Sequence, residues 1–272
     1  MPNPAPRAHR LLRVTLPKLG KDARCSLTPY YRSRPETWRR QLGSIDARIA
    51  VSLHYKYTYI RIPKAANSTV AATLDHHFPA PPIPRISGKE RGRGKRSYDR
   101  LSSLSRAEAE QVLAEHFTFT VVRNPYHRVL SAFLQKFIAE GSSRERWLNR
   151  FAAEIRTYGG GELTFPAFCR WLDRVGLRQN IHWLPQTAIL SVTGLERLDD
   201  MGHVETLEED LRRIVERIGA TPEGLEVQRS GPAATRAGQK AQQYYTDECM
   251  AIVRRLYADD FRHLGYRDDT LA

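Results

Sequence analysis

The sequence contains little cysteine and no long hydrophobic run. Its three cysteines are far apart, form no C-x-x-C pair and are odd in number, which argues against a disulfide framework and predicts free thiols in a reducing compartment. The nine histidines show no H-E-x-x-H or other metal-ligand spacing, so no metal site is expected. No segment approaches the roughly 20 apolar residues of a membrane-spanning helix, and we expect no membrane span.

The N-terminal segment also lacks the apolar centre of a secretory signal peptide. Proline and arginine interrupt it repeatedly, whereas a signal peptide carries an unbroken apolar stretch. The sequence therefore predicts a cytoplasmic protein. Residues 1–50 are basic, rich in proline and weakly periodic, and we interpret them as a basic N-terminal arm or an irregular covering layer. Residues 51–272 are predicted to form a single domain.

A large excess of basic residues indicates an anionic partner. Lysine and arginine number 43 against 30 aspartates and glutamates among 272 residues, a net charge of +13. Such an excess is typical of proteins that bind nucleic acid, anionic membranes, polyanionic sugars or phosphorylated ligands, and composition does not choose among them. Cations are densest in residues 79–100, which show no apolar periodicity and are predicted to form a flexible basic loop. Its cations are Arg85, Lys89, Arg91, Arg93, Lys95, Arg96 and Arg100.

Hydrophobic periodicity predicts an α/β fold. Two runs rich in β-formers, residues 55–62 and 118–122, are each followed by a turn and a helical pattern. Helices are predicted over residues 70–77, 105–114, 129–138, 144–157, 164–175, 207–218 and 246–258. Thr206 and Glu209 fit a capping box at the start of one of them, and Gly219 fits its end. The alternation of strands and helices indicates a central, mostly parallel sheet flanked by helices on both faces.

The turn after the first strand has the form of a phosphate-binding loop. It consists of Pro63, Lys64, Ala65, Ala66, Asn67, Ser68 and Thr69. A turn that enters a helix presents backbone N–H groups and a positive dipole end to an anion, and its alanines allow a close approach. The hydroxyls add donors, Lys64 adds a full charge, and Asn67 or Ser68 is the expected helix cap. The lysine comes early and no glycine is present, unlike the G-x-x-x-x-G-K-[ST] order of a nucleotide-kinase loop.

The turn after the second strand has a similar design. Arg123 stands at the end of that strand, and Ser131 follows in the first turns of the next helix. A guanidinium fork and a hydroxyl at the carboxyl edge of a sheet form an anion site. Two anion sites at neighbouring strand ends suit a ligand with phosphates on both sides of a ribose.

Together these segments resemble the sulfotransferases that use 3′-phosphoadenosine 5′-phosphosulfate (PAPS), in particular the carbohydrate branch of the HNK-1 and chondroitin 4-O type. Residues 62–69 look like the family's 5′-phosphosulfate loop, and residues 122–137 look like its 3′-phosphate segment. Downstream, residues 182–186, 202–210 and 257–266 are similar to blocks of the same branch. The resemblance covers roughly residues 55–267 and implies a P-loop-like sulfotransferase fold.

The resemblance also implies the activity and the site. The chain would transfer a sulfuryl group from PAPS to a hydroxyl of a sugar or polysaccharide, possibly an anionic one, with no metal. The residues implied to hold PAPS are Lys64, Ala65, Ala66, Asn67, Ser68, Thr69, Arg123 and Ser131. Lys64 would neutralise charge on the leaving oxygen, as cations do in phosphoryl transfer. His182 is the first candidate for the general base, and His54, His116 and Glu205 stay open.

Some positions depart from the family pattern. Asn124 stands where the family usually has aspartate, and Ala66 stands where it often has glycine. Cysteines common in Golgi members are missing near residues 188–190, and no Golgi anchor is expected, which suits a cytosolic relative.

The sequence also suggests two other functions. A protein that binds nucleic acid or another polyanion would explain the basic loop, but no zinc finger or RNA-binding aromatic motif accompanies it, and nucleic acid is not the expected partner. A P-loop kinase is opposed by the position of Lys64 in its loop.

Overall fold

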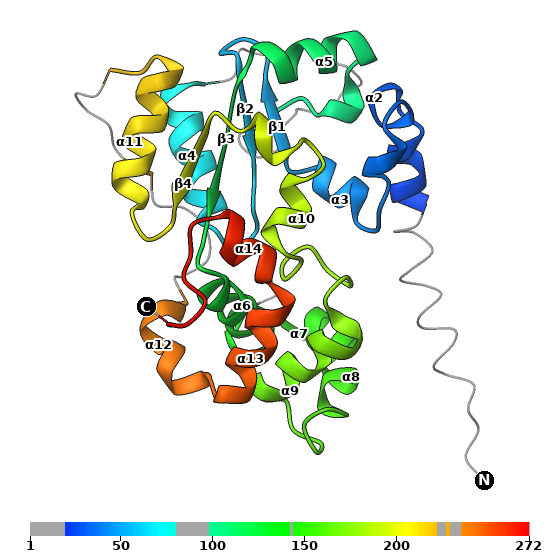
Figure 1. Cartoon of the computed structure of the whole chain (residues 1–272), viewed down its shortest axis with the longest axis vertical. Coiled ribbons are helices and arrows are strands. Elements are labelled where there is room, and N and C mark those ends of the chain that lie inside the picture. The colour runs from blue at the N-terminus through cyan, green and yellow to red at the C-terminus, as the bar shows by residue number, and fades with distance from the viewer. Residues whose placement is uncertain (1–19, 80–97, 142–143, 222–226, 229–234, 272) are drawn as a thin grey trace.

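The computed structural model describes residues 20–79, 98–141, 144–221, 227–228 and 235–271 (Figure 1). Within them, four strands form one sheet in the order β1-β2-β3-β4. The strands are β1 (Ile49–Ser52), β2 (Tyr57–Ile60), β3 (Phe117–Val122) and β4 (Asp200–His203). β1 runs antiparallel to β2, whereas β2, β3 and β4 are parallel. The predicted α/β fold with a mostly parallel sheet is confirmed.

Helices cover both faces of this sheet, because side chains alternate between the faces along each strand. On one face, α4 (Asn67–His77) and α11 (Leu207–Ile218) pack against Tyr59, Phe119 and Val121 (Figure 1). On the other face, Ile60 and Val122 pack in a second cluster. The helices that contribute to that second cluster are α2 (Pro29–Arg32), α3 (Leu42–Asp46), α5 (Arg106–Glu115) and α10 (Gln186–Leu190).

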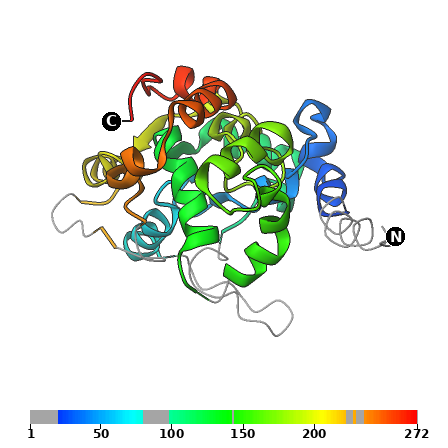
Figure 2. The same ribbon diagram turned by 90° about the horizontal axis from the view of Figure 1, so that it is seen from below.

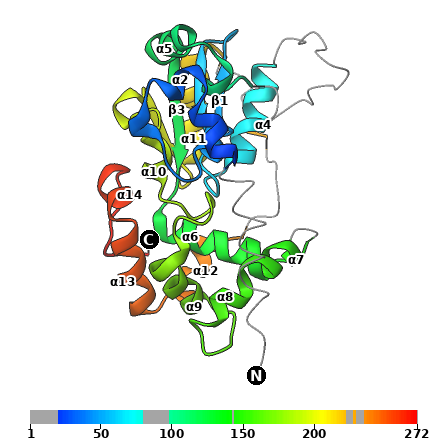
Figure 3. The same cartoon turned by 90° about the vertical axis from the view of Figure 1, so that its right-hand side faces the viewer.

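A helical layer lies beyond the carboxyl ends of the parallel strands (Figures 2 and 3). It contains α6 (Pro125–Phe133), α7 (Arg144–Trp147), α8 (Ala153–Arg156), α9 (Phe165–Trp171), α12 (Ala237–Tyr244), α13 (Asp247–Leu256) and α14 (Ala258–His263). Its core is aromatic, with Phe133, Phe168, Trp171 and Trp183 almost fully buried. No helix in the described ranges is long and apolar enough to cross a membrane.

Wider, π-helical turns occur within or at the end of three predicted helices. π-helical segments follow α6 at Leu134–Ile138, α7 at Leu148–Ala152 and α9 at Leu172–Gly176. Short 3-10 turns lie at Pro35–Thr37, Leu101–Ser103 and Leu195–Arg197. π-helical turns occur frequently at functional sites because they rotate the side chains that follow, and the segment after α6 contributes to the site described below.

The N-terminal segment is not an extended arm where it is described. Residues 20–26 are helical, and α2 and α3 follow them. Tyr30, Tyr31, Leu42 and Ile45 are fully buried in the cluster against the sheet. The segment is therefore a helical form of the expected covering layer, with these four side chains buried and Leu27 and Trp38 exposed. Residues 1–19, and most of the basic 79–100 loop, lie outside the described residues.

The structure corrects two predicted helix caps. α4 begins at Asn67, and Ala66, not Asn67 or Ser68, occupies the cap position with a left-handed φ of 46°. The predicted capping box of α11 is wrong, because Thr206 Oγ1 donates to Asp210 Oδ2 at 2.6 Å instead of binding the helix backbone. The predicted end of α11 at Gly219 is confirmed.

Candidate functional site

Four charged residues meet at one edge of the sheet because of its topology. Lys64, Arg123 and Glu205 follow the carboxyl ends of the parallel strands β2, β3 and β4. Arg48 precedes β1, and because β1 is antiparallel, its start lies at the same edge. Carboxyl ends of parallel strands are where open α/β sheets bind their ligands, so the site is built at this edge.

The loop between β2 and α4 is held in an uncommon conformation. Lys64 and Ala66 both have left-handed φ values, 73° and 46°, a region that residues other than glycine adopt rarely. Alternation of left-handed and ordinary residues curls a backbone into a concavity of N–H groups that binds anions. Backbone strain of this kind costs about 1–3 kcal/mol per residue and occurs most often at ligand sites. Ala66 adopts this conformation although it has a Cβ atom, which glycine lacks.

Lys64 is bound to the π-helical segment that follows α6. Its Nζ donates to Gln135 Oε1 at 2.9 Å. Burial, together with the neighbouring cations Arg123, Lys136 and Arg128, lowers the pKa of the Lys64 ammonium to about 7. An anion bound at this position would offset the positive charge of these neighbours and stabilise the protonated lysine.

Arg123 joins the two predicted anion loops. Its Nη1 donates to the backbone oxygen of Lys64 at 3.2 Å, and the side chain of Gln186 pairs with its backbone N–H and C=O at 3.0 and 2.8 Å. Its Nε is buried and has no hydrogen-bond partner among the described residues. Burial lowers the pKa of the guanidinium, and Glu205 partly offsets that effect. A buried guanidinium N–H without a partner is costly, and an anion would satisfy it.

Ser131 lies on α6 and is buried. Its Oγ is 2.9 Å from Thr235 Oγ1, and either hydroxyl can be the donor. Thr235 immediately precedes the left-handed Arg236 and α12. The predicted serine is thus near a second polar segment that the sequence analysis did not identify, because the two are more than 100 residues apart.

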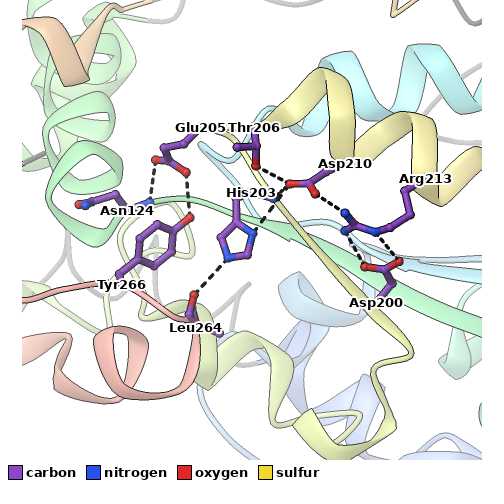
Figure 4. A network of polar contacts seen from close by, with 9 residues as sticks. All are labelled: Asn124, Asp200, His203, Glu205, Thr206, Asp210, Arg213, Leu264 and Tyr266. Carbon is purple, nitrogen blue, oxygen red and sulfur yellow. Dashed lines mark hydrogen bonds and ion pairs between the residues drawn. The ribbon is translucent and has the colours of Figure 1, made fainter.

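Glu205 is fixed by three neighbours at the end of β4, of which Figure 4 shows Asn124 and Tyr266. Its Oε1 accepts from the Asn124 N–H at 3.1 Å and lies 3.6 Å from His127 Nδ1. Its Oε2 accepts from the Tyr266 hydroxyl at 2.9 Å. These donors lower the pKa of Glu205 against the effect of burial, so it is a carboxylate. The contact with Asn124 links β4 to the residue beside Arg123.

A second network stabilises the start of α11 below Glu205 (Figure 4). Asp210 Oδ2 accepts from the His203 N–H at 2.8 Å, and Oδ1 accepts from Arg213 at 2.6 Å. Arg213 also binds Asp200 at 2.9 Å, and its pKa is raised by the two carboxylates. The network joins both ends of β4 to α11 and so fixes the position of Glu205.

Arg128 connects the first loop to the segment that contains His182. It is fully buried on α6. Its guanidinium donates to the carbonyl oxygens of Pro63, Leu184 and Ile181 at 2.9, 2.8 and 3.3 Å. Three carbonyls of two different loops therefore depend on one side chain. Arg128 lies within the predicted 3′-phosphate segment, residues 122–137, where no role was predicted for it.

His182 lines a cavity of about 290 Å³. Its Nδ1 is 2.7 Å from Asn180 Oδ1, which also accepts from the His182 N–H at 3.2 Å. Because that oxygen is an acceptor, Nδ1 carries the proton and Nε2 carries the lone pair. Burial and the surrounding cations, Lys136 and Arg48 first, keep the pKa of His182 well below its usual range. A neutral imidazole with a free Nε2 lone pair can accept a proton.

The other two candidate histidines are at the wrong edge of the sheet. His54 is exposed in the turn before β2, and His116 precedes β3. Both lie at the amino ends of strands whose carboxyl ends carry Lys64 and Arg123.

A larger cavity, of about 530 Å³, lies on the β4 side of the site. It is lined by Thr69 of the first loop, by Glu205 and the start of α11, and by Val227. The site therefore has two neighbouring cavities, one lined by Glu205 and one lined by His182. Among the described residues no cluster of histidine, cysteine, aspartate or glutamate could hold a metal ion.

The sequence is similar to known sulfotransferases. A model of the sulfotransferase family matches residues 47–267. Carbohydrate sulfotransferase 10 of Pongo abelii is 28% identical over 81% of this chain and 67% of its own length. Carbohydrate sulfotransferase 14 is 30% identical in Homo sapiens over 67% of this chain, and 32% identical in Danio rerio over 66%. The chain covers about half the length of those two relatives. No solved structure matches it.

Proposed function

The chain belongs to the sulfotransferase family, and on that premise we propose that it transfers a sulfuryl group from PAPS to a hydroxyl of a carbohydrate. The observation that carries the proposal is the joined pair of anion loops, with Arg123 bound to the backbone of Lys64 and its own Nε unpartnered among the described residues. A donor with a 5′-phosphosulfate and a 3′-phosphate needs two such sites side by side. The carbohydrate acceptor is inferred from the relatives' names.

The donor is proposed to lie along the carboxyl edge of β2, β3 and β4. The 5′-phosphosulfate would occupy the P-loop-like turn of residues 64–69, where Lys64 and the left-handed backbone face it. The 3′-phosphate would lie at Arg123 and Ser131. The adenosine would fill the cavity of about 530 Å³ beside Thr69 and Val227, since that cavity adjoins the first loop on the side of α11.

The acceptor hydroxyl is proposed to enter from the other side of Lys64, through the cavity lined by His182. As the hydroxyl oxygen bonds to sulfur, the bond from sulfur to the bridging phosphate oxygen breaks and adenosine 3′,5′-bisphosphate leaves. His182 Nε2 takes the hydroxyl proton, because its neutral form is favoured by burial and by nearby cations. Lys64 neutralises the charge that grows on the bridging oxygen.

We also propose that the protein acts in the cytoplasm.

Sulfuryl transfer itself provides the test. The purified chain is incubated with PAPS and a panel of neutral and acidic oligosaccharides, and adenosine 3′,5′-bisphosphate and sulfated sugar are measured by liquid chromatography and mass spectrometry. We expect one molecule of adenosine 3′,5′-bisphosphate to form for each molecule of sulfated sugar. Both products should be lost in Lys64→Met. Release of the nucleotide at the same rate with and without sugar, or phosphate transfer from ATP and Mg²⁺, would contradict the proposal.

A further inference from the structure

The cavity beside His182 is lined on one side by arginines. Its walls include Arg48 before β1, Arg146 on α7 and Arg150 in the π-helical turn that follows α7. The remaining lining residues are Gln41, Ser44, Trp147, Asn180, Ile181 and His182. None of the described residues that line it is acidic. Three guanidinium groups around a cavity of about 290 Å³ are a concentration of charge that folding alone does not require.

Among the residues that the structure describes, the three guanidinium groups have few polar partners. Arg48 is half-buried, and its Nη1 donates to the backbone oxygen of Ser44 at 2.9 Å. Burial and neighbouring arginines lower the pKa of Arg48 to about 10. The guanidinium of Arg150 lies over the Phe151 ring, 4.7 Å from its centroid. Burial and the neighbouring Arg146 lower the pKa of Arg150. Like charges held together without a carboxylate destabilise the fold, so the cluster is consistent with an external anion.

Further donors lie at the same cavity. Trp147 packs edge-on against His182, with 5.3 Å between the ring centroids, and its indole Nε1 is buried with no hydrogen-bond partner among the described residues. Lys136 Nζ lies 4.5 Å from the centroid of the Trp147 ring. Burial, with Arg146 and Arg48, lowers the pKa of Lys136 to about 8. Cations and the indole N–H of Trp147 therefore lie close to His182.

We propose that Arg48, Arg146 and Arg150 bind an anionic substituent, a carboxylate or a sulfate, on the sugar that His182 activates. The inference rests on the proposed function and assigns its acceptor specificity to these side chains. A guanidinium fork matches either oxyanion in bidentate geometry. An anion held here fixes the sugar ring beside His182 and leaves a hydroxyl of the same or the next ring free to reach the donor.

The test combines a change in the ligand with a change in the protein. Adenosine 3′,5′-bisphosphate is kept at saturation so that the donor site is filled, and acceptors are titrated by isothermal calorimetry. The probes are an unsulfated chondroitin hexasaccharide, its carboxyl-reduced form, and the carboxyl-reduced form carrying 6-O-sulfate. The variant is Arg146→Gln with Arg150→Gln. The control, Arg156→Gln with Arg212→Gln, removes the same charge from exposed positions outside the cavity.

We expect the carboxyl-reduced hexasaccharide to bind at least about tenfold more weakly than the carboxylate form, because one charge-assisted contact is worth that much. The Arg146 and Arg150 variant should lose that difference, and the control variant should keep it. Restored affinity of the 6-O-sulfated probe identifies sulfate as an accepted anion; no restoration restricts the site to carboxylates. Equal affinity of acidic and neutral hexasaccharides, no binding of either, or equal losses in both variants would overturn the inference. Failure of adenosine 3′,5′-bisphosphate to bind would instead overturn the proposed function.

Discussion

Lys64 Nζ donates a hydrogen bond to Gln135 Oε1 at 2.9 Å, which ties the amino group of the first loop to the π-helical segment after α6. The bond holds a lysine whose pKa is lowered to about 7 by burial and by neighbouring cations. A hydrogen bond to the charged form favours that form. Gln135 therefore orients the lysine and favours its protonated form in a strongly basic site.

Replacing Lys64 with methionine should lower kcat about a hundredfold or more and should weaken PAPS binding less. The reason is that charge on the leaving oxygen develops in the transition state, where one such contact is worth about 3–4 kcal/mol. Steady-state kinetics and calorimetric binding of adenosine 3′,5′-bisphosphate separate the two effects. A variant with an unchanged kcat and a large loss of nucleotide affinity would show that Lys64 only binds the donor.

The pH dependence of kcat/KM for PAPS should be bell-shaped. Lys64 must be protonated, so the rate should fall as pH rises through its pKa of about 7. His182 must be neutral, and because its pKa is well below 6.5, the acid limb should lie below that value. Lys64→Arg should move the basic limb to higher pH, and Gln135→Leu should move it to lower pH. A basic limb that neither substitution moves would assign it to another group.

Adenosine 3′,5′-bisphosphate should bind at least tens-fold more tightly than AMP, and Arg123 with Ser131 should account for most of the difference. The buried Arg123 Nε has no partner among the described residues, and a charge-assisted bond contributes about 1.5–3 kcal/mol. Calorimetric titration of both nucleotides into the unmodified protein and into Arg123→Ala, Ser131→Ala measures the difference. Similar affinities for the two nucleotides in the unmodified protein would contradict a 3′-phosphate site at Arg123 and Ser131.

Arg128→Met should destabilise the protein by about 3–5 kcal/mol, because three buried carbonyls lose their donor at once. Urea unfolding followed by circular dichroism gives the change in the free energy of unfolding. The exposed Arg156→Met on α8 serves as the control and should change it by no more than about 0.5 kcal/mol. A loss of similar size in both variants would show that the carbonyl contacts of Arg128 contribute little.

The sequence determined the parts of this protein that depend on neighbouring residues. The strand around Tyr59, the strand up to Val122 and the helix that ends at Gly219 were predictable because alternation, helical periodicity and the left-handed preference of glycine are local properties. The two loops that begin at Lys64 and Arg123 were identified in the same way. Local rules were wrong where a tertiary partner competed, as at Thr206, whose hydroxyl binds Asp210 instead of the helix backbone.

Only the tertiary structure decided which distant residues share the site. Parallel pairing of β2 and β3 brings Lys64 beside Arg123, and the reversed direction of β1 brings Arg48 to the same edge. The π-helical turn after α6 places Gln135 on Lys64, and Arg128 joins the Pro63 loop to the segment around His182. No local pattern encodes these contacts, because they arise from strand order and from hydrogen bonds between residues 53 to 71 positions apart in the chain.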